Sequence, residues 1–374
     1  MTRFELPAPY RVVGDPREAA CWWPPHPADP RDGLPWARGS RRSAGERFVG
    51  TDGGPALWLR PVVHGDGSPA RMNAVDVCAG LVSEVPAPEL LVAEARAGCP
   101  CQVVVAANGY GSPRIEARDA SRAERLDLLA AVVEAARRAG AVPAVLHCPA
   151  GDPLLELLPD LDFAVGVTDL YPTLELPGDS IEHYLAALPH RRRIDARREM
   201  RQLAAGGSAR VYAGRGAAAH LGVAAELVSL AYANRGQHAE PAEVCGIYTR
   251  LLEACQDDFV LCVVEAGGAA VSSACLVQGA TDLLLYSAGI RLPQSREVAG
   301  YFNAAYYVPI AFAYERGLRR MRLGPSGVRT KRYRGARFVP LHSAVPRSCA
   351  PLAALLRATD EHVRRELAGL AGGA

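Results

Sequence analysis

The sequence contains almost no lysine. It has 374 residues and 42 basic side chains, of which Lys331 is the only lysine and all the others are arginine. With 40 acidic residues the formal net charge is +2, which excludes a chain coated with positive charge for nucleic acid or for an anionic membrane. A coding bias that also enriches glycine, proline and alanine explains most of the arginine excess. It does not explain why one lysine is kept.

Cysteines are few, and no long apolar segment is present. The 10 cysteines are scattered, and Cys99-Pro-Cys101 is too closely spaced, and lacks a second half, for a zinc site. We expect reduced, buried thiols. The first residues lack the apolar core of a signal peptide, and no apolar stretch reaches the length of a membrane span. The sequence therefore predicts a cytoplasmic protein with no membrane span, no metal and no bound cofactor.

The apolar pattern predicts two domains. Apolar residues make up 49% of the chain and charged residues 22%, which suits a folded globule, and the length favours two cores. Ser121 and Glu124 have the spacing of a capping box at the start of an amphipathic helix. The strands expected in the first half are 56–63, 101–107, 144–147 and 163–168, and the helices are 121–139 and 152–158. This alternation indicates an α/β first domain, residues 1–175.

Residues 176–374 show a different order of elements. Helices at 179–188 and 190–205 come first. A strand, two helices, a three-stranded meander, a helix, a strand, a loop, a strand and a closing helix follow. In that order these elements are 209–212, 217–233, 241–256, 258–265, 269–278, 282–288, 297–316, 320–323, 324–337, 338–343 and 350–369. We expect a second domain here, and we expect Pro309 to kink its helix.

An ordered set of residues in the second domain resembles one family. It runs from Tyr306-Tyr307 through Gly317 and Leu323-Gly324 to Thr330-Lys-Arg-Tyr-Arg-Gly335. With the element order, this set resembles the end of the Fem-like aminoacyltransferases, which contain two GNAT acyltransferase units. A related family named for peptidoglycan recognition shares the Lys and the following Arg-Gly. The resemblance implies an α/β fold with mixed sheets, two tandem GNAT-like domains, and an acyltransferase with its active site in the second domain.

The resemblance gives the single lysine a role. In Fem-type enzymes the matching lysine serves the bound aminoacyl end, and the resemblance maps that role onto Lys331. Acyl transfer to an amine passes through a tetrahedral oxyanion, and a fixed cation stabilises that charge more than it stabilises the ground state. A compact ammonium differs from a planar guanidinium in reach and geometry. The alternative is a solvated lysine in the loop 324–337.

Three other side chains of the second domain are catalytic candidates, because the acceptor amine must lose a proton. Glu265 ends a strand of the meander, and Tyr286 lies on its third strand, where it could face the reacting carbonyl. His342 follows a strand and could act near neutral pH. Each has a structural alternative, since a strand tyrosine or a histidine among apolar neighbours is commonly a core or edge residue.

Candidates for binding the substrate come from one helix and two basic clusters. The helical candidates, which could line a pocket or simply pack, are Asn303, Tyr306, Tyr307 and Tyr314. The clusters at 190–201 and 316–337 could hold a phosphate-rich ligand, since arginine grips phosphate bidentately; for the first, an ordinary charged helix face is the alternative. The arginines of interest in them are Arg192, Arg193, Arg332 and Arg334.

The class of acyl donor is inferred from a glycine pattern that the sequence lacks. Enzymes of the GNAT fold that use acyl-CoA carry Gln/Arg-x-x-Gly-x-Gly/Ala, whose backbone N–H groups hold the pyrophosphate at a helix N-terminus. Here Gln294 is followed by Glu297 and Ala299 at the two glycine positions. The cradle is therefore absent or rebuilt, which favours a donor held otherwise, such as aminoacyl-tRNA.

These observations predict an N-acyltransferase that forms an amide or peptide bond. We expect it to move an aminoacyl group from aminoacyl-tRNA to the amine of a small molecule, either a specialised metabolite or a cell-wall precursor. Its expected partners are tRNA and that amine. Two alternatives stay open. One is a GNAT N-acyltransferase that uses acyl-CoA or an acyl-carrier protein, and the other is a catalytically silent double-GNAT binding module.

Overall fold

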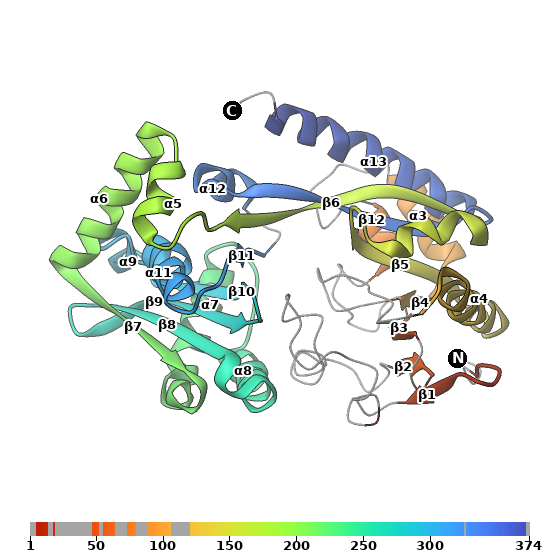
Figure 1. Cartoon of the computed structure of the whole chain (residues 1–374), viewed down its shortest axis with the longest axis horizontal. Coiled ribbons are helices and arrows are strands. Elements are labelled where there is room, and N and C mark those ends of the chain that lie inside the picture. Colours follow the sequence, from red (N-terminus) through yellow and green to blue (C-terminus); the bar gives the residue numbers. More distant parts are fainter. Residues whose placement is uncertain are drawn as a thin grey trace. The chain divides into compact units, whose positions relative to one another are not determined.

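The computed structural model describes residues 5–13, 18, 47–51, 55–63, 73–79, 89–105, 120–324 and 327–371. They form two compact units, whose elements are labelled in Figure 1. Unit 1 contains the described residues up to Tyr171 and those from Phe338 onward, and unit 2 contains Pro172–Arg337. Both units have parallel and antiparallel strand pairs and helices, so the predicted α/β class with mixed sheets is confirmed.

The strands of unit 1 lie in the order β1-β2-β3-β4-β5-β12-β6, with β4 and β5 parallel. They are β1 (Arg11–Val13), β2 (Arg47–Gly50), β3 (Ala56–Val63), β4 (Cys101–Val105), β5 (Val142–Pro149), β6 (Phe163–Glu175) and β12 (Arg337–Pro346). The helices are α2 (Ala74–Cys78), α3 (Glu89–Gly98), α4 (Arg122–Arg138) and α13 (Ala350–Ala371). The helix predicted at 152–158 is instead two 3₁₀ turns, η4 (Pro153–Glu156) and η5 (Leu158–Leu161).

Each face of the unit 1 sheet has its own hydrophobic core, because side chains alternate along a strand. Val103 and Val105 of β4 belong to the core under α4, whereas Val104 belongs to the core formed with α2, α3 and α13. The predicted capping box of α4 is present. The Ser121 Oγ accepts from the Glu124 N–H at 3.3 Å, and the Glu124 carboxylate accepts from the Ser121 N–H at 2.8 Å.

The C-terminal strand and helix belong to unit 1, which corrects the predicted second domain of 176–374. β12 pairs antiparallel with β5, where Leu341 lies opposite Pro149 and His342 opposite Cys148. α13 packs with α2 and α3 in one core of unit 1. Pairing between segments so distant along the chain leaves no local sequence pattern, so spacing alone assigned these elements to the wrong unit. The division after Tyr171 falls inside β6, close to the predicted boundary at 175.

The strands of unit 2 lie in the order β6-β11-β10-β9-β8-β7, beginning with the end of β6. They are β7 (Gly207–Ala213), β8 (Phe259–Ala266), β9 (Ala269–Gln278), β10 (Asp282–Ile290) and β11 (Arg320–Arg322). The helices are α5 (Ile181–Ala187), α6 (His190–Gly206), α7 (Leu221–Ala233), α8 (Pro241–Cys255), α9 (Gln294–Glu297), α10 (Gly300–Phe302), α11 (Val308–Glu315) and α12 (Val328–Tyr333). The 3₁₀ turns are η6 (Gly214–His220) and η7 (Gln256–Asp258), and η8 (Asn303–Tyr307) is π-helical. The predicted order of strand, two helices and antiparallel meander is confirmed.

Helices cover both faces of the unit 2 sheet. α7 crosses one face so closely that a Cβ on Gly289 of β10 would stand 2.6 Å from its backbone, which explains the glycine. Ser273 of β9 pairs with Gly289, so its neighbour Ser272 points to the opposite face. There the Ser272 Oγ bonds to the Ser295 Oγ of α9 at 2.6 Å. The run from α9 to α11 therefore lies across the sheet from α7.

The helix predicted at 297–316 changes type along its length. α10, η8 and α11 follow one another, and the π-helical turn η8 ends just before Val308. Pro309 has no N–H to donate to the carbonyl four residues earlier, at Ala305. A wider turn at this point accommodates the missing bond, so the irregularity predicted from Pro309 is a change of helix type. Such turns are frequent at functional sites.

One helical stretch, Gly214–Ala233, has the length and apolar composition to cross a membrane, and it is the only one among the described residues. Its residues Ala224, Leu227 and Val228 are buried. Leu227 and Val228 lie against Gly289 of β10, and 39% of the apolar window is buried inside the structure.

Candidate functional site

Lys331 lies on α12, within the segment predicted to be a loop at 324–337. The helix begins after Gly327, whose φ of 77° is in the left-handed region that favours glycine. The Lys331 residue is only 5% exposed, and its Nζ donates to the carbonyl oxygen of Gly324. A buried ammonium is costly unless acceptors surround it. The Lys331 side chain is therefore buried and held by a hydrogen bond, and the alternative of a solvated loop lysine is wrong.

The Lys331 amine lies at the carboxyl end of a parallel strand pair. β10 and β11 pair only where Asp282–Leu284 lies beside Arg320–Arg322, and β10 then continues to Ile290. The acceptor of the lysine, Gly324, lies just beyond the end of β11. In open α/β sheets ligands bind beyond the carboxyl ends of parallel strands. The single lysine therefore lies at the end of the sheet where a ligand is expected.

Contacts from α5 and α6 fasten α12 in place. The helix has only 6 residues, too few to be stable by itself, so tertiary contacts decide its position. Arg192 Nη1 of α6 donates to the Arg332 carbonyl at 2.8 Å, and the Tyr184 hydroxyl of α5 donates to the Arg334 carbonyl at 2.7 Å. Both donors serve the C-terminal end of α12, where carbonyl groups lack helical partners and attract positive charge.

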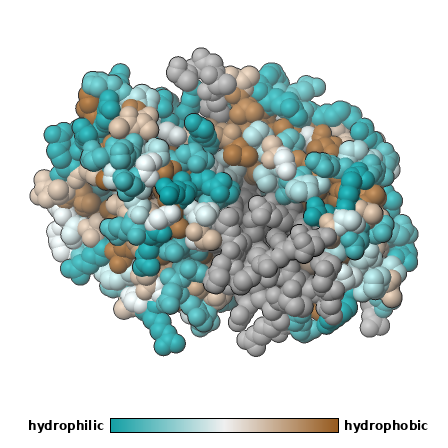
Figure 2. Space-filling view, in the orientation of Figure 1, coloured by the Kyte–Doolittle hydropathy of each residue, from teal (hydrophilic) through white to brown (hydrophobic). Residues whose placement is uncertain are grey.

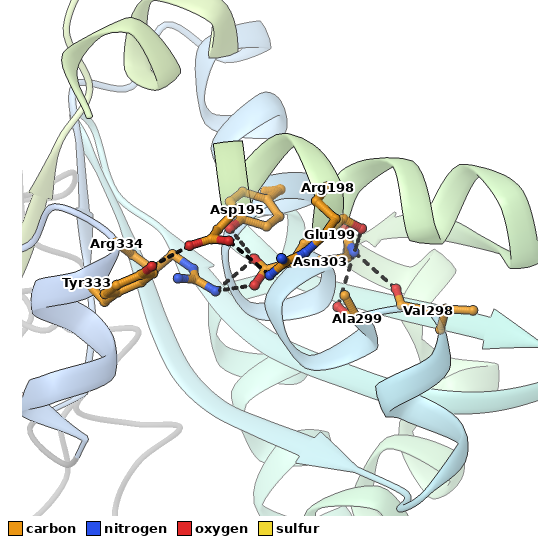
Figure 3. A network of polar contacts seen from close by, with 9 residues as sticks. Asp195, Arg198, Glu199, Val298, Ala299, Asn303, Tyr333 and Arg334 are labelled. Atoms are coloured by element: carbon orange, nitrogen blue, oxygen red, sulfur yellow. Dashed lines mark hydrogen bonds and ion pairs between the residues drawn. The ribbon is translucent and has the colours of Figure 1, made fainter. Parts of the chain in front are cut away.

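Two acidic side chains of α6 complete the attachment (Figure 3). Arg334 is 3% exposed, and its Nη2 donates to both carboxylate oxygens of Glu199 at 2.7 Å. The neighbouring Tyr333 donates its hydroxyl to the Asp195 carboxylate, which also pairs with Arg198 at 2.9 Å. Charge-assisted bonds of this kind are stronger than neutral ones. The buried ion pair is therefore the main polar anchor of α12.

Glu199 also joins α12 to the π-helical turn η8. The Tyr307 hydroxyl donates to the Glu199 carboxylate at 2.5 Å, and Asn303 Nδ2 donates to the Glu199 backbone carbonyl at 3.0 Å. The Arg334 guanidinium lies 4.0 Å from the ring centroid of Phe302, in the geometry of a cation–π contact. Glu199 thus connects α6 both to α12 and to the run from α10 to α11.

The network shifts the pKa values of its hydroxyl groups. Burial raises the pKa of Tyr307, the charge of Arg334 offsets part of this rise, and the hydrogen bond to Glu199 adds to it. The hydrogen bond from Tyr333 holds the pKa of Asp195 below its usual value, and the same bond raises the pKa of Tyr333. Both tyrosines are therefore hydrogen-bond donors at neutral pH rather than bases.

The other catalytic candidates lie apart from this network. Tyr286 lies at a bulge in β10 and stands edge-on to Tyr248 of α8, with 6.4 Å between ring centroids. Glu265 lies near the end of β8, opposite β7. His342 is on β12 in unit 1, where burial lowers its pKa. The prediction that His342 belongs to the same domain as Lys331 is therefore wrong.

The predicted substrate-binding residues have mainly internal partners. Those whose side chains hold neighbouring elements together are Arg192, Asn303, Tyr307 and Arg334. Tyr306 is fully buried beside Tyr301, with ring centroids 6.1 Å apart. Arg332 offers its carbonyl to α6, and Arg193 is partly exposed and donates to the Ala186 carbonyl at 3.4 Å. Direct contact of these residues with a substrate stays a prediction.

Exposed arginines give α6 a basic surface. They are Arg191, Arg197, Arg198 and Arg201. Arg197 pairs with Glu182 at 2.7 Å, and Arg198 pairs with Asp195, so acids compensate part of the charge. In Figure 2, hydrophilic residues predominate where Figure 1 places α5 and α6. This surface is the one to which the predicted phosphate contacts apply best.

Buried carboxylates neutralise part of the second basic cluster, residues 316–337. Arg320 Nε and Arg322 Nε donate to the two carboxylate oxygens of Asp282 at 2.9 and 2.6 Å, and Asp282 is fully buried. Arg320, Arg322 and Arg334 of the 316–337 cluster thus each have an acidic partner within unit 2.

The segment after β10, which lacks the glycine pattern of CoA-dependent enzymes, is closely packed. The residues after β10 form α9, whose Ser295 is buried against Ser272. A Cβ on Gly300, the first residue of α10, would stand 2.8 Å from the Ser295 Oγ and 2.9 Å from the Ser272 Oγ. The space beside Gly300 is therefore filled by the hydroxyl groups of Ser272 and Ser295. Among the described residues, no group of three or more His, Cys, Asp or Glu side chains could hold a metal ion.

Comparison with known families decides the family of the chain. The FemAB-like family model, described as peptidoglycan biosynthesis/recognition, matches residues 176–370, which is more than half of the sequence. The chain belongs to the FemAB-like family. A comparison with curated proteins found no match.

Solved structures show the fold of this FemAB-like protein in other chains. FemX is 12% identical, with a TM-score of 0.56 over 89% of this chain and 96% of that chain. L-PGS from Bacillus licheniformis is 10% identical, with a TM-score of 0.55 over 92% of this chain and 97% of that chain. A conserved protein of unknown function from Bacteroides thetaiotaomicron is 11% identical, with a TM-score of 0.53 over 90% and 99%. At these identities the likeness concerns the fold alone.

The predicted membership among Fem-like double-GNAT proteins is confirmed, and so is the acyltransferase class of that family. The family match begins at residue 176, just before α5, and it includes both α6 and α12. Lys331 therefore lies in the part of the chain that carries the family likeness.

Sequence reasoning missed the acidic half of the network. Asp195 and Glu199 lie on α6 in a segment whose most conspicuous residues are arginines. Their spacing of four residues places them on one helical face, which was the available signal. That signal gains meaning only once Arg334 is known to face α6.

Proposed function

We propose that this protein is an N-acyltransferase that moves an aminoacyl group from aminoacyl-tRNA to an amine. The acceptor is a small molecule, either a specialised metabolite or a cell-wall precursor. The observation that carries the proposal is the position of Lys331, the only lysine, buried on α12 at the carboxyl end of the parallel pair β10–β11. Because aminoacyl-tRNA is a cytoplasmic donor, the proposal agrees with the location expected from the sequence.

The lysine would act by stabilising charge. Its ammonium is fixed by the Gly324 carbonyl on a helix that the Glu199–Arg334 pair anchors. A fixed cation in a site with little water stabilises the tetrahedral oxyanion without reorganising during the reaction, an effect worth about 3 to 4 kcal/mol, or 10² to 10³ in turnover. The residues around α12 position the cation, and they need not touch the substrate.

The surroundings of the donor site favour tRNA over coenzyme A. The segment after β10 lacks the glycine pattern of a pyrophosphate cradle, and Ser272 and Ser295 pack closely against Gly300, which supports a donor held by other means. The exposed arginines of α6 offer a surface for a phosphate backbone, so binding of the donor should weaken steeply with salt.

Tyr286 and Glu265 stay the proposed groups for the acceptor amine. Tyr286 lies just beyond Leu284, the last residue of β10 that is paired with β11, and a bulge at this point re-aims side chains. Glu265 is the alternative acceptor for the proton. Turnover measured against pH for Tyr286→Phe and for Glu265→Gln distinguishes the two candidates.

A turnover screen tests the function. Purified protein is incubated with pools of charged tRNA, with acyl-CoAs or with a charged acyl-carrier protein, together with amine acceptors, and products are identified by mass spectrometry. The proposal expects amide products from charged tRNA. Products from acyl-CoA, with protection of the protein against heat by coenzyme A, would overturn it in favour of a CoA-dependent enzyme. Binding without turnover would favour the silent binding module.

Substitution of the lysine tests the site. Lys331→Ala should lower kcat by about 10² to 10³, and Lys331→Arg should lower it less, since the guanidinium keeps the charge but not the geometry. Arg329→Ala is the matched control, because it removes an exposed positive charge from the same helix. It should leave kcat unchanged. Full activity of a folded Lys331→Ala protein would sink the assignment.

A further inference from the structure

Two cysteine side chains of unit 1 lie in direct contact. The Sγ atoms of Cys99 and Cys349 are 3.0 Å apart, although 250 residues separate them in the sequence. Cys99 connects α3 to β4, and Cys349 directly precedes α13. Both side chains pack in the core that α2, α3 and α13 share. The contact is therefore fixed by the packing of α13 on α3.

The two thiols differ in accessibility. Cys99 is fully buried, whereas Cys349 is partly exposed, so a small solute reaches Cys349 first. The hydrogen bond from Cys99, assisted by the Leu352 N–H of α13, lowers the pKa of Cys349 to about 6, although burial opposes the shift. The same contact raises the pKa of Cys99. These shifts favour the thiolate on Cys349, with Cys99 as the hydrogen-bond donor.

We propose that Cys349 and Cys99 form an oxidation site that reacts with hydrogen peroxide or a small organic peroxide and closes to a disulfide. The partly exposed Cys349 is the attacking sulfur, and the buried Cys99 is the resolving sulfur. The site lies in unit 1, and it does not depend on the proposed acyl transfer.

The reaction runs in two balanced steps. The Cys349 thiolate attacks one oxygen of the peroxide, the O–O bond breaks, and Cys349 becomes a sulfenic acid while hydroxide, or the alkoxide of an organic peroxide, leaves. The Cys99 sulfur then attacks the Cys349 sulfur, the S–O bond breaks, and hydroxide leaves with the proton of Cys99 as water. In total, two thiols are oxidised to one disulfide, and hydrogen peroxide is reduced to two waters or an organic peroxide to one alcohol and one water. The sulfurs need to approach by only about 1 Å, since a disulfide bond is about 2.05 Å long.

Closure would tie the start of α13 to the end of α3. A cross-link over so long a segment restricts the unfolded chain strongly, so the oxidised protein should melt at a temperature higher by about 5 °C or more. Cys78 belongs to the same core, but burial raises its pKa, which leaves it a poor competitor for the peroxide.

Peptide mapping of the oxidised protein tests the site. The reduced full chain is treated at pH 7 with a small excess of hydrogen peroxide, free thiols are blocked, and the digest is analysed by mass spectrometry. The result expected is one cross-linked peptide pair containing Cys99 and Cys349, with the rise in melting temperature reversed by a dithiol reductant. Retention of both thiols in reduced form, or a cross-link of Cys349 to Cys78, would overturn the proposal.

Variants separate the two sulfurs. Cys99→Ala should stop the reaction at a sulfenic acid on Cys349 that dimedone traps, formed more slowly because the hydrogen bond that lowers the pKa of Cys349 is lost. Cys349→Ser should leave Cys99 reduced. Cys101→Ser is the matched control near Cys99, and it should keep the cross-link. The rate of the wild-type reaction should follow the ionisation of Cys349, rising through about pH 6 and levelling above it. A rate that still rises steeply at pH 8 would contradict the assignment of Cys349 as the attacking thiolate.

Discussion

Removing the carboxylate of Glu199 should loosen α12 and, with it, Lys331. Glu199 accepts both hydrogen bonds of the Arg334 Nη2 and the hydroxyl of Tyr307. In Glu199→Ala the buried guanidinium of Arg334 would lose the carboxylate to which it is hydrogen-bonded. Leaving one member of a buried ion pair alone costs about 3 to 5 kcal/mol. The lost acceptor of Tyr307 adds about 1 kcal/mol or more, while the ring of Phe302 keeps part of the guanidinium interaction.

The cost falls on α12 because the helix is too short to hold itself. A loss of about 3 to 5 kcal/mol raises the population of the detached helix by roughly a hundredfold to a few thousandfold, at 1.4 kcal/mol per factor of ten. Amide hydrogen exchange measured by mass spectrometry reports this population directly. The amides to follow are those of Lys331 and Arg334, whose N–H groups bond to the carbonyls of Gly327 and Lys331.

Two further variants make the measurement specific. Glu182→Ala removes an exposed carboxylate that pairs with Arg197 at 2.7 Å, and it should cost only about 0 to 1 kcal/mol. Glu199→Ala combined with Arg334→Met removes both buried charges, and it should exchange more slowly than Glu199→Ala alone. Equal exchange of the α12 amides in Glu199→Ala and Glu182→Ala would refute the reasoning, because it would mean that the ion pair does not hold the helix.

Two other predictions follow from packing and from burial. Thermal melting should show that Gly300→Ala destabilises the protein by about 1 to 3 kcal/mol, since the new methyl group meets the hydroxyls of Ser272 and Ser295. In the same assay, Gly222→Ala should stabilise the protein by up to about 1 kcal/mol. Gly222 lies on the exposed side of α7, and a Cβ there would have nothing within 4 Å. Equal effects of the two would contradict the close packing of α10. Burial lowers the pKa of His342, so below about pH 6.5 the unfolded chain binds a proton before the folded chain does, and stability falls as the pH drops. His342→Gln should reduce the loss of melting temperature between pH 7.5 and 5, and an unchanged loss would show that the ring is not the cause.

Local patterns made much of the fold predictable. Ser121 and Glu124 cap α4 because their spacing alone lets each side chain reach the backbone of the other. The turn at Gly267-Gly268 follows from two residues that both take positive φ, 58° and 79°. These features lie within a few residues of one another, so the sequence contains all the information that they need.

Composition also pointed to Lys331. An arginine-rich chain with one lysine, located in a family-like segment, makes that residue the first candidate. Its burial and its bond to Gly324 were not predictable, because they depend on the formation of α12 where the spacing indicated a loop. The short helix has no strong apolar period, and its stability comes from partners on α5 and α6.

The sequence by itself determined the order of the elements and the family, and it made one lysine the first candidate for the site. Only the tertiary structure decided which unit holds β12 and which acid holds Arg334. The strand pairs with β5, and the arginine meets Glu199 across 135 residues of chain. Contacts between such distant segments depend on burial and on the match of opposite charges in the folded chain, and neither leaves a repeating pattern in the sequence.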